Sequence, residues 1–225
     1  MPNTALIVGA SRGLGRGLAQ EYLRRGWRVI GTVRNERGER ALRETGDVQV
    51  ERLDVADEAQ GEALARKLKR ETLDLLFLNA GVMGPPELLS ASADEIDQVM
   101  QANAFGPAKL AWRLLERVPS RTGVVAFMST GMGSIADNSS GGYDVYRASK
   151  AAQNMLARSL WAAEGQSRGI TMLSINPGWV KTDMGGRGAS IDVATSVRGI
   201  AEQVERHAGA GGHRFIGWNG REWPW

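Results

Sequence analysis

The sequence predicts an α/β fold, with a doubly wound, mostly parallel sheet of about seven strands and helices on both faces. Three observations predict this fold. Short apolar runs alternate with helical stretches along nearly all 225 residues. One of these runs, residues 73–79, is apolar in the way that a parallel strand buried on both faces requires. The 29 glycines suit the many tight turns of such a fold.

The expected elements follow one another in a regular order. Strands are expected at residues 4–9, 27–33, 48–53, 73–79, 123–129 and 170–176, with a short strand near 214–216. Helices are expected at residues 14–25, 57–70, 93–117, 145–163 and 191–207. No repeat, low-complexity tract or linker interrupts this order, so we expect residues 1–225 to form one Rossmann-type domain.

Composition excludes several classes of site. The chain has no cysteine, which rules out disulfides and thiolate metal sites. Its two histidines, His207 and His213, have no ligand cluster around them in the sequence, so no metal is expected. A Gly-x-Ser-x-Gly elbow of the hydrolase type is also absent.

Charge and hydropathy narrow the partners and the location. The net charge is +3, but basic residues alternate with acidic ones, as at residues 34–40 and 66–71, which is typical of solvated helix faces. We therefore expect no nucleic-acid partner. No apolar stretch is long enough to span a bilayer, and Met1 runs almost directly into a strand, which leaves no room for a signal peptide. The expected location is the cytoplasm.

A glycine-rich turn joins the first strand to the first helix. Its glycines allow a tight turn, close approach of the backbone to a pyrophosphate, and close packing of helix on strand. Free amides at the helix N-terminus would then face the phosphates. The spacing Gly-x-x-x-Gly-x-Gly departs from the commoner Gly-x-Gly-x-x-Gly, so the prediction depends on the position of the turn between strand and helix. The residues expected to hold a dinucleotide here are Gly9, Ser11, Arg12, Gly13, Leu14 and Gly15.

The end of the second strand determines which nicotinamide cofactor is expected. An acidic residue there would bind the ribose 2′-hydroxyl of NAD(H). The strand instead ends in Thr32-Val33-Arg34, and the preceding turn offers Arg12. Two guanidinium groups suit a 2′-phosphate, so NADP(H) is favoured over NAD(H). Two observations leave NAD(H) open, since Arg34 could be a solvated loop charge and Glu36 lies nearby.

A second motif, Tyr146-x-x-x-Lys150, places a phenol and an ammonium on one helix face. A nearby ammonium favours the phenolate and lowers the pKa of the tyrosine from its usual value of about 10. That shift moves the phenol toward the range useful for general acid–base catalysis. The motif is common by chance as a surface pair. Here, however, it begins a helix that follows the hydroxyl-rich Ser129-Thr130.

The order and spacing of these motifs resemble the short-chain dehydrogenase/reductase family along nearly the whole chain. The matching motifs are Gly9–Gly15, Asp54-Val55, Asn79-Ala80-Gly81, Asn103, Ser129-Thr130, Tyr146-x-x-x-Lys150 and the run from Asn176 to Thr182. Finer features are similar to the carbonyl reductase branch that includes sniffer and C-factor-like proteins. They are Gly133-Ser134-Ile135, the run from Lys181 to Gly186, and Trp223-Pro224-Trp225.

The resemblance implies a role for each catalytic residue. Tyr146 would protonate the carbonyl oxygen as hydride arrives, and Lys150 would hold the nicotinamide ribose and lower the pKa of the tyrosine. Asn103 would keep a water in the proton relay. The family's serine, which polarises the substrate carbonyl, aligns with Thr130, although Ser129 or Ser134 could compete for this role.

The resemblance also implies the remaining cofactor contacts. Asp54 and Val55 would flank the adenine, and Asn79, Ala80 and Gly81 would shape the wall of the cofactor cleft. Contacts to the nicotinamide end are implied for Pro177, Gly178, Val180 and Thr182. Two other interpretations stay open, because Asn79 could only satisfy backbone groups and Pro177-Gly178 could only turn the chain.

These residues indicate an NADPH-dependent oxidoreductase that transfers a hydride between nicotinamide and a small carbonyl or alcohol substrate. The alternative is a nucleotide-binding signalling or scaffold protein of the C-factor type, because a fold does not fix function. An intact set of Tyr146, Lys150 and Asn103 favours the enzyme.

The sequence predicts only a broad substrate class and the presence of an oligomer. Met132, Trp179 and Met184 would supply apolar walls, which suits aromatic or apolar ketones, aldehydes and quinones. The glycine-rich segment 184–191 suggests a mobile lid. A homo-oligomer built on a dimer is expected, through residues 93–117 and the helix that starts at Val145.

Overall fold

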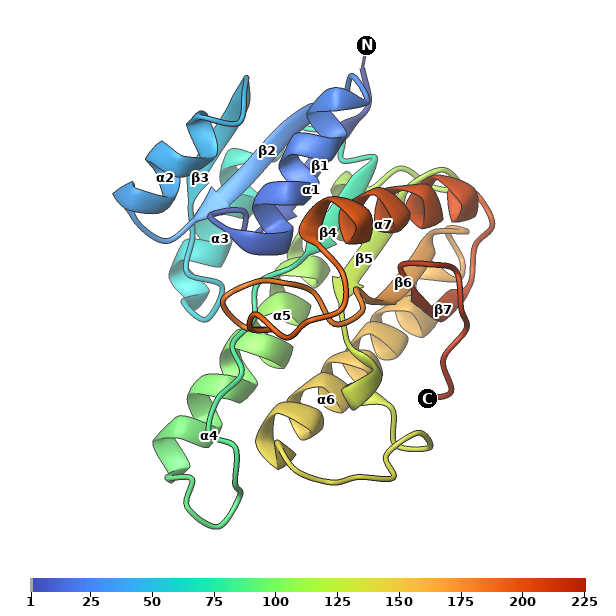
Figure 1. The fold of residues 1–225 in the computed structure, drawn as a ribbon. Helices are drawn as coiled ribbons and strands as arrows, with labels where there is room; N and C mark the ends of the chain where they lie inside the picture. Colours follow the sequence, from blue (N-terminus) through green and yellow to red (C-terminus); the bar gives the residue numbers. More distant parts are fainter. Residues whose placement is uncertain (1) are drawn as a thin grey trace.

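The computed structural model describes residues 2–225, and within them seven strands form one sheet with helices on both faces (Figure 1). The strand order is β3-β2-β1-β4-β5-β6-β7, and every neighbouring pair is parallel. The strands are β1 (Thr4–Val8), β2 (Arg28–Val33), β3 (Val48–Arg52), β4 (Leu75–Leu78), β5 (Val124–Met128), β6 (Thr171–Asn176) and β7 (His213–Gly217). This confirms the predicted doubly wound sheet, which is parallel throughout rather than mostly parallel.

Helices connect the strands. The α-helices are α1 (Gly13–Arg24), α2 (Glu36–Arg43), α3 (Glu58–Lys67), α4 (Ala93–Met100), α5 (Gly106–Leu114), α6 (Asp144–Leu160) and α7 (Val193–His207). Two π-helical turns, η1 (Gln101–Phe105) and η4 (Trp161–Gly165), and two 3-10 turns, η2 (Leu115–Arg117) and η3 (Gly131–Gly133), complete the set. None of these helices combines the length and the apolar character that crossing a membrane would need.

Side chains of the central strands alternate between two apolar cores, one on each face of the sheet. Ile7 of β1 points into the core that contains Tyr22 of α1 and Ile200 of α7. Its neighbour Leu6 points into the core that contains Leu110 of α5 and Leu160 of α6. Both faces of the strands are therefore buried, which explains why their sequences are apolar runs and not alternating patterns.

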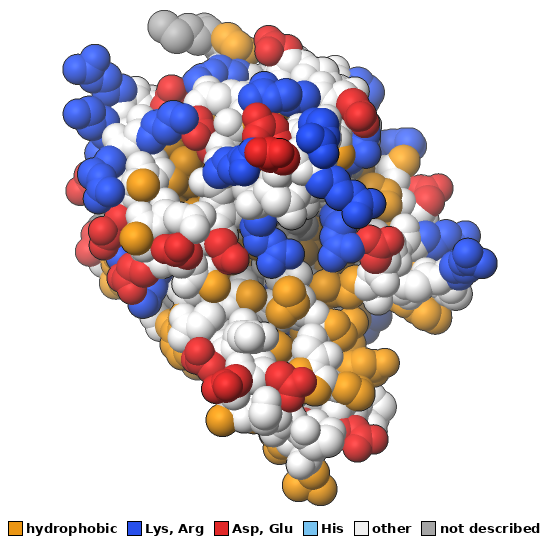
Figure 2. Space-filling model, turned by 90° about the vertical axis from the view of Figure 1, so that its left-hand side faces the viewer, with side chains coloured by type: hydrophobic (Ala, Val, Ile, Leu, Met, Phe, Trp, Pro, Cys, Tyr) orange, Lys and Arg blue, Asp and Glu red, His pale blue; other side chains and the backbone are white. Residues whose placement is uncertain are grey.

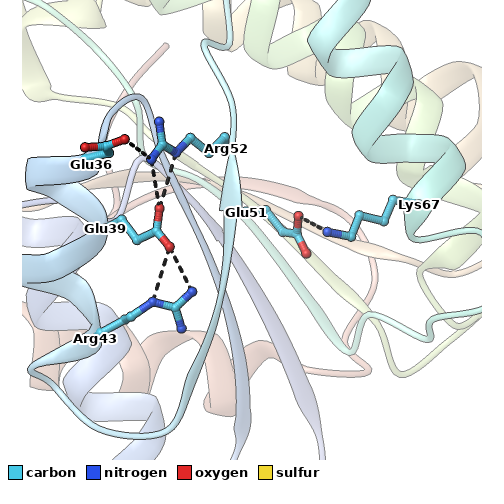
Figure 3. Close-up of polar contacts among 6 residues, drawn as sticks. All are labelled: Glu36, Glu39, Arg43, Glu51, Arg52 and Lys67. Atoms are coloured by element: carbon cyan, nitrogen blue, oxygen red, sulfur yellow. Dashed lines mark hydrogen bonds and ion pairs between the residues drawn. The ribbon is translucent and has the colours of Figure 1, made fainter.

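One helix was not predicted. Residues 36–43 form α2, whose N-cap is Asn35, with the side-chain oxygen accepting a hydrogen bond from the Gly38 amide at 2.9 Å. Leu42 is the one large apolar side chain of this helix, and it packs into the core. The segment therefore lacks the apolar stripe that signals an amphipathic helix. Ion pairs support it instead, as Figure 3 shows for Glu39, which lies between Arg43 and Arg52.

The long helical region expected at residues 93–117 is present but is interrupted by η1. The Gly106 amide donates to the carbonyl of Gln101, five residues back, where an α-helix would use Ala102. Pro107 has no amide hydrogen to offer the carbonyl of Asn103. The carbonyls of Ala102 and Asn103 thus lose the i+4 donors that an unbroken α-helix would supply.

The direction in which the chain adds strands to the sheet reverses between β1 and β4. The chain builds outward from β1 through β2 to β3, then crosses back and builds outward from β4 to β7. In open parallel sheets, ligands bind at such a switch point, outside the carboxyl ends of the strands.

Candidate active site

A cleft of about 1180 Å³ lies along the carboxyl ends of the strands. Its lining includes the ends of β1, β2, β5 and β6, the loops that follow these strands and β4, and residues 53–55 after β3. On the face drawn in Figure 2, Lys and Arg side chains gather over the upper half, whereas hydrophobic side chains gather over the lower half. The upper half corresponds in height to the region of α1, α2 and α3 in Figure 1.

Glycines of the β1–α1 turn remove side chains where backbones meet. Gly9 has a φ of +86°, and a Cβ there would lie 2.9 Å from the Cα of Ala80. A Cβ on Gly15 would lie 2.0 Å from the carbonyl oxygen of Gly9. Gly9 and Gly13 line the cleft, but Gly15 does not, because it serves the packing of α1 against the end of β1.

Asn79 ties the ends of β1 and β4 together at this turn. Its side-chain amide donates to the carbonyl of Gly9 at 2.7 Å, and the residue also lines the cleft. Asn79 therefore fits both interpretations of its role, because it bonds to a backbone carbonyl and also forms part of the cleft wall.

The two arginines expected at the 2′-phosphate have different surroundings. Arg12 forms an ion pair with Asp183 of the loop after β6, with 2.5 Å between Nη1 and Oδ2, and both side chains are largely exposed. Arg34 lines the same cleft and forms no ion pair with any residue in the range 2–225. Glu36, the nearby acid, lies 3.5 Å from Arg52 (Figure 3).

Tyr146 and Lys150 lie on α6, are both buried, and both line the cleft. The Lys150 ammonium donates to the carbonyl of Met128 at 2.7 Å and to Oε1 of Gln153 at 3.3 Å. Its nitrogen is 6.0 Å from the ring centre of Tyr146. A Cβ on Gly81 would approach that nitrogen to 3.4 Å, so the glycine keeps this part of the wall open.

Burial determines the protonation of this pair. Desolvation raises the pKa of Tyr146 to about 12 and lowers the pKa of Lys150 to about 7. The sequence-based prediction that the ammonium lowers the pKa of the tyrosine is wrong for this structure, because loss of solvent dominates and the lysine is bound to the end of β5. Tyr146 is consequently protonated at neutral pH, which is the form that can donate a proton.

Asn103 is fully buried in η1 and does not line the cleft. Its side-chain oxygen accepts from the Val82 amide at 2.7 Å. Its side-chain nitrogen donates to the carbonyl of Val82 at 2.8 Å and to the hydroxyl of Ser149 at 2.9 Å. The side chain thus joins η1 to the loop after β4 and to α6, and only its backbone carbonyl lacks the usual helical donor.

Three hydroxyls compete for the position beside Tyr146. Ser129 donates its hydrogen to Oδ1 of Asn154 at 2.8 Å. Ser134 lies outside the cleft lining. Thr130 lines the cleft, and its oxygen accepts from the Met132 amide at 3.2 Å, which leaves its hydrogen free to donate. The hydrogen-bond pattern favours Thr130.

The other expected contact residues also lie along the cleft. They are Ser11, Leu14, Asp54, Val55, Ala80, Gly81, Pro177, Gly178, Val180 and Thr182, together with the apolar Met132, Trp179 and Met184. The segment 184–191 is attached at both ends, because Val180 pairs with Ile191 and the Trp179 indole donates to the carbonyl of Gly185 at 2.8 Å.

The lining residues that sequence reasoning missed include Tyr143, Asp183 and Trp223, which come from distant segments. Tyr143 has a φ of +54°, which is unusual for an aromatic residue, and it follows Gly141-Gly142, also at positive φ. The glycine pair was a local signal that could have marked this turn. No local signal connects Trp223 with the cleft.

Comparison with known proteins relates this geometry to a family. Residues 3–190 match the family model described as short chain dehydrogenase. C-signal of Myxococcus xanthus is 35% identical over 175 residues, which cover 72% of this chain and 99% of that protein.

Solved structures match over essentially the whole chain. A short-chain dehydrogenase/reductase from Burkholderia multivorans with bound NADP has a TM-score of 0.94 at 39% identity, covering 100% of both chains. A carbonyl reductase from Pseudomonas aeruginosa PAO1 in complex with NADP has a TM-score of 0.90 at 37% identity, again covering 100% of both. The carbonyl reductase Sniffer of D. melanogaster has a TM-score of 0.88 at 28% identity, with the same coverage. These matches confirm the resemblance drawn from the motifs.

Proposed function

The chain belongs to the short-chain dehydrogenase/reductase family, and we propose that it is an NADPH-dependent reductase of small carbonyl compounds. One observation carries the proposal: the protonated phenol of Tyr146, the free hydroxyl of Thr130 and the glycine-rich turn line a single cleft. A proton donor and a carbonyl-polarising donor beside a dinucleotide site are what reduction of a C=O bond requires.

The residues present fit NADP(H). Backbone at Gly9 and Gly13 reaches the cleft without side chains, which suits a pyrophosphate at the N-terminus of α1. Arg34, which forms no ion pair within residues 2–225, offers its guanidinium to a 2′-phosphate, and Arg12 would add a second on leaving Asp183. The NADP named with the Burkholderia and Pseudomonas structures supports the same choice.

In the proposed mechanism, NADPH when bound would supply a hydride to the carbonyl carbon. Thr130 donates a hydrogen bond to the carbonyl oxygen and orients it, and Tyr146 gives that oxygen its proton. Lys150 would bind the nicotinamide ribose beside Gly81, where the absence of a side chain gives it access. Proton resupply uses the backbone carbonyl of Asn103, which can hold a water because Pro107 offers it no hydrogen bond.

The substrate class follows from the apolar lining. Met132, Trp179 and Met184 face the cleft together with the phenols of Tyr143 and Tyr146. Aromatic and thioether side chains pack well against planar apolar groups. Aromatic or apolar ketones, aldehydes and quinones are the substrates that this lining suits.

The similarity to C-signal favours a second candidate, a nucleotide-binding signalling protein with little turnover. This candidate requires neither a proton donor nor a free hydroxyl in the cleft. The signalling candidate predicts that variants at Tyr146 and Thr130 keep the effect of the protein in the cell. The reductase candidate predicts that the same variants lose that effect.

Assembly is proposed as a homo-oligomer built on a dimer. Phe105 of η1, Trp112 of α5 and Met155 of α6 are exposed apolar side chains on the elements expected to pair. Sedimentation at micromolar concentration tests this, and a monomer there contradicts it. The cytoplasmic location stays a prediction.

The proposed function is tested by following NADPH and NADH consumption against a panel of carbonyl compounds. We expect NADPH-dependent reduction of aromatic ketones and aldehydes, with weaker use of NADH. Absence of turnover with the whole panel, in a protein that binds NADPH, would favour the signalling candidate.

A further inference from the structure

Residues 218–225 fold back along the outer edge of β7. Glu222 forms an antiparallel bridge with Ile216, and the Gly217 amide donates to the carbonyl of Arg221 at 2.7 Å. The Trp223 amide donates to the carbonyl of Phe215 at 2.9 Å. These backbone bonds fix the position of Trp223 relative to the sheet.

The Trp223 side chain lines the cleft and lies against Gly131, the residue that follows Thr130. A Cβ on Gly131, the next residue along the chain, would lie 2.5 Å from Cζ3 of the indole and 2.6 Å from Cη2. Only a glycine at 131 therefore accommodates the indole in this position. The guanidinium of Arg221 lies 4.5 Å from the centre of the ring and holds it from another side.

Other apolar side chains along the cleft are more exposed than Trp223. Tyr143, Trp179 and Met184 have exposed fractions of 45%, 59% and 44%, and all three belong to loops or loop junctions. The cleft is thus bordered by an indole whose backbone is fixed to the sheet, next to Gly131, and elsewhere by more exposed apolar side chains.

We infer that Trp223 closes the substrate site beside Thr130, so that the protein selects aldehydes and methyl ketones. Their small substituent, a hydrogen or a methyl group, lies against the indole, and the larger substituent extends toward the exposed loops. This inference rests on the proposed reductase function. In the reaction, the carbonyl carbon gains the hydride of NADPH and the oxygen gains the proton of Tyr146, giving an alcohol and NADP⁺.

Selection by a fixed wall has a stereochemical consequence. The hydride reaches one face of the carbonyl, so the side on which the small group lies sets the configuration of the alcohol. A Trp223 that only stabilised the fold would affect the amount of active protein but not the configuration of its product.

The test compares Trp223→Ala with the unaltered protein on acetophenone and on isobutyrophenone, in which isopropyl replaces the methyl group. We expect the enantiomeric ratio of 1-phenylethanol to fall at least about tenfold, and the kcat/KM of isobutyrophenone relative to acetophenone to rise by a similar factor. Both quantities are ratios, so partial loss of folded protein does not change them. Where Trp223→Ala yields no folded protein, Trp223→Leu is used, with smaller changes in the same directions.

Trp225→Ala is the matched control. This residue is a tryptophan of the same segment, but its ring packs on His213 and Phe215, at 4.7 Å and 5.4 Å between ring centres, and it does not line the cleft. Both ratios should stay within about twofold in this variant, and NADPH affinity, measured by fluorescence, should be unchanged in all variants.

Unchanged ratios in Trp223→Ala, or equal changes in Trp225→Ala, overturn the inference while leaving the reductase function intact. Racemic alcohol from the unaltered protein overturns it as well. Failure of the unaltered protein to reduce any carbonyl compound overturns both the inference and the proposed function.

Discussion

The cofactor half and the substrate half of the cleft are built in different ways. Around the ends of β1 and β4 the wall is built on backbone packed so closely that a Cβ on Gly9 would overlap main-chain atoms of Ala80. Around residues 130–143, 179–185 and 223 the wall consists of side chains, several of them exposed. A wall made of backbone accepts one ligand shape, whereas a wall made of side chains can change its selectivity by substitution without disturbing the sheet.

The largest expected effect is on catalysis by Tyr146, and it should leave cofactor binding unchanged. In Tyr146→Phe only the phenolic hydroxyl is lost, so kcat for carbonyl reduction should fall by about 10³-fold, within the range for a lost general acid. NADPH affinity, measured by fluorescence titration, should stay within about twofold. An equal loss of NADPH affinity would mean that the Tyr146 hydroxyl also serves cofactor binding, and would contradict this prediction.

A smaller loss is expected at Thr130. Thr130→Val keeps the shape but removes the hydroxyl, and kcat should fall by about 10²-fold, the scale of a lost oxyanion donor. Thr130→Ser is the control that keeps the hydroxyl and most of the activity. Near-normal turnover of the valine variant in steady-state kinetics would assign the role to Ser129.

Arg34 tests the cofactor half alone. Arg34→Ala should weaken NADPH binding about thirtyfold, because a charge-assisted bond to the 2′-phosphate is lost, and should leave NADH binding nearly unchanged. Arg40→Ala, at an exposed arginine of α2 outside the cleft, is the control. Equal weakening of both cofactors by Arg34→Ala in fluorescence titrations would contradict the 2′-phosphate assignment.

Lys150 lies where the halves meet, and its burial predicts a pH effect on stability. The pKa of Lys150 is about 7 in the folded protein, against 10.5 for the exposed side chain. Between pH 7 and 10.5 the lysine is therefore protonated in the unfolded chain and mostly neutral in the folded protein. The free energy of unfolding should therefore rise with pH above 7, by up to about 1.4 kcal/mol per pH unit from this residue. Urea unfolding of the cofactor-free protein at pH 7, 8 and 9 measures the rise. Lys150→Met should reduce it, and an identical slope in the variant would show that the lysine is not desolvated.

The smallest effect concerns a glycine that does not line the cleft. A Cβ on Gly61 of α3 would meet no atom within 4 Å, in contrast to Gly15 of α1. Gly61→Ala should raise the free energy of unfolding by roughly 0.5–1 kcal/mol, because alanine favours the helix. Gly15→Ala should instead abolish NADPH binding or folding. Similar outcomes for the two substitutions in denaturation and titration experiments would refute the close-packing argument.

The same contrast explains what the sequence could predict. The seven strands, the glycine turn and the Tyr146–Lys150 pair depend on local periodicity and spacing, and the structure has them where expected. Helix α2 was missed because its charged residues leave one large buried apolar side chain, Leu42, too few for a periodic signal. The direction of the Tyr146 pKa was wrong because spacing gives the neighbouring charge but not the extent of burial.

Features that join distant segments were beyond the reach of local patterns. Arg12 and Asp183 are 171 positions apart, and their ion pair depends on how two loops meet across the cleft. Trp223 meets Gly131 because residues 218–225 fold back over β7, which no motif near either residue indicates. The substrate half collects most of these long-range contacts, so it was the less predictable half.

The antiparallel attachment of residues 218–225 to β7 also covers part of an edge of the sheet. β7 is an edge strand of the sheet, and the pairing covers backbone groups that another chain could otherwise use for strand addition. Local opening of this segment removes Trp223 from its place and uncovers the edge in the same event. On heating, loss of stereochemical control and the onset of intermolecular β-pairing should therefore begin at the same temperature, below that of global unfolding.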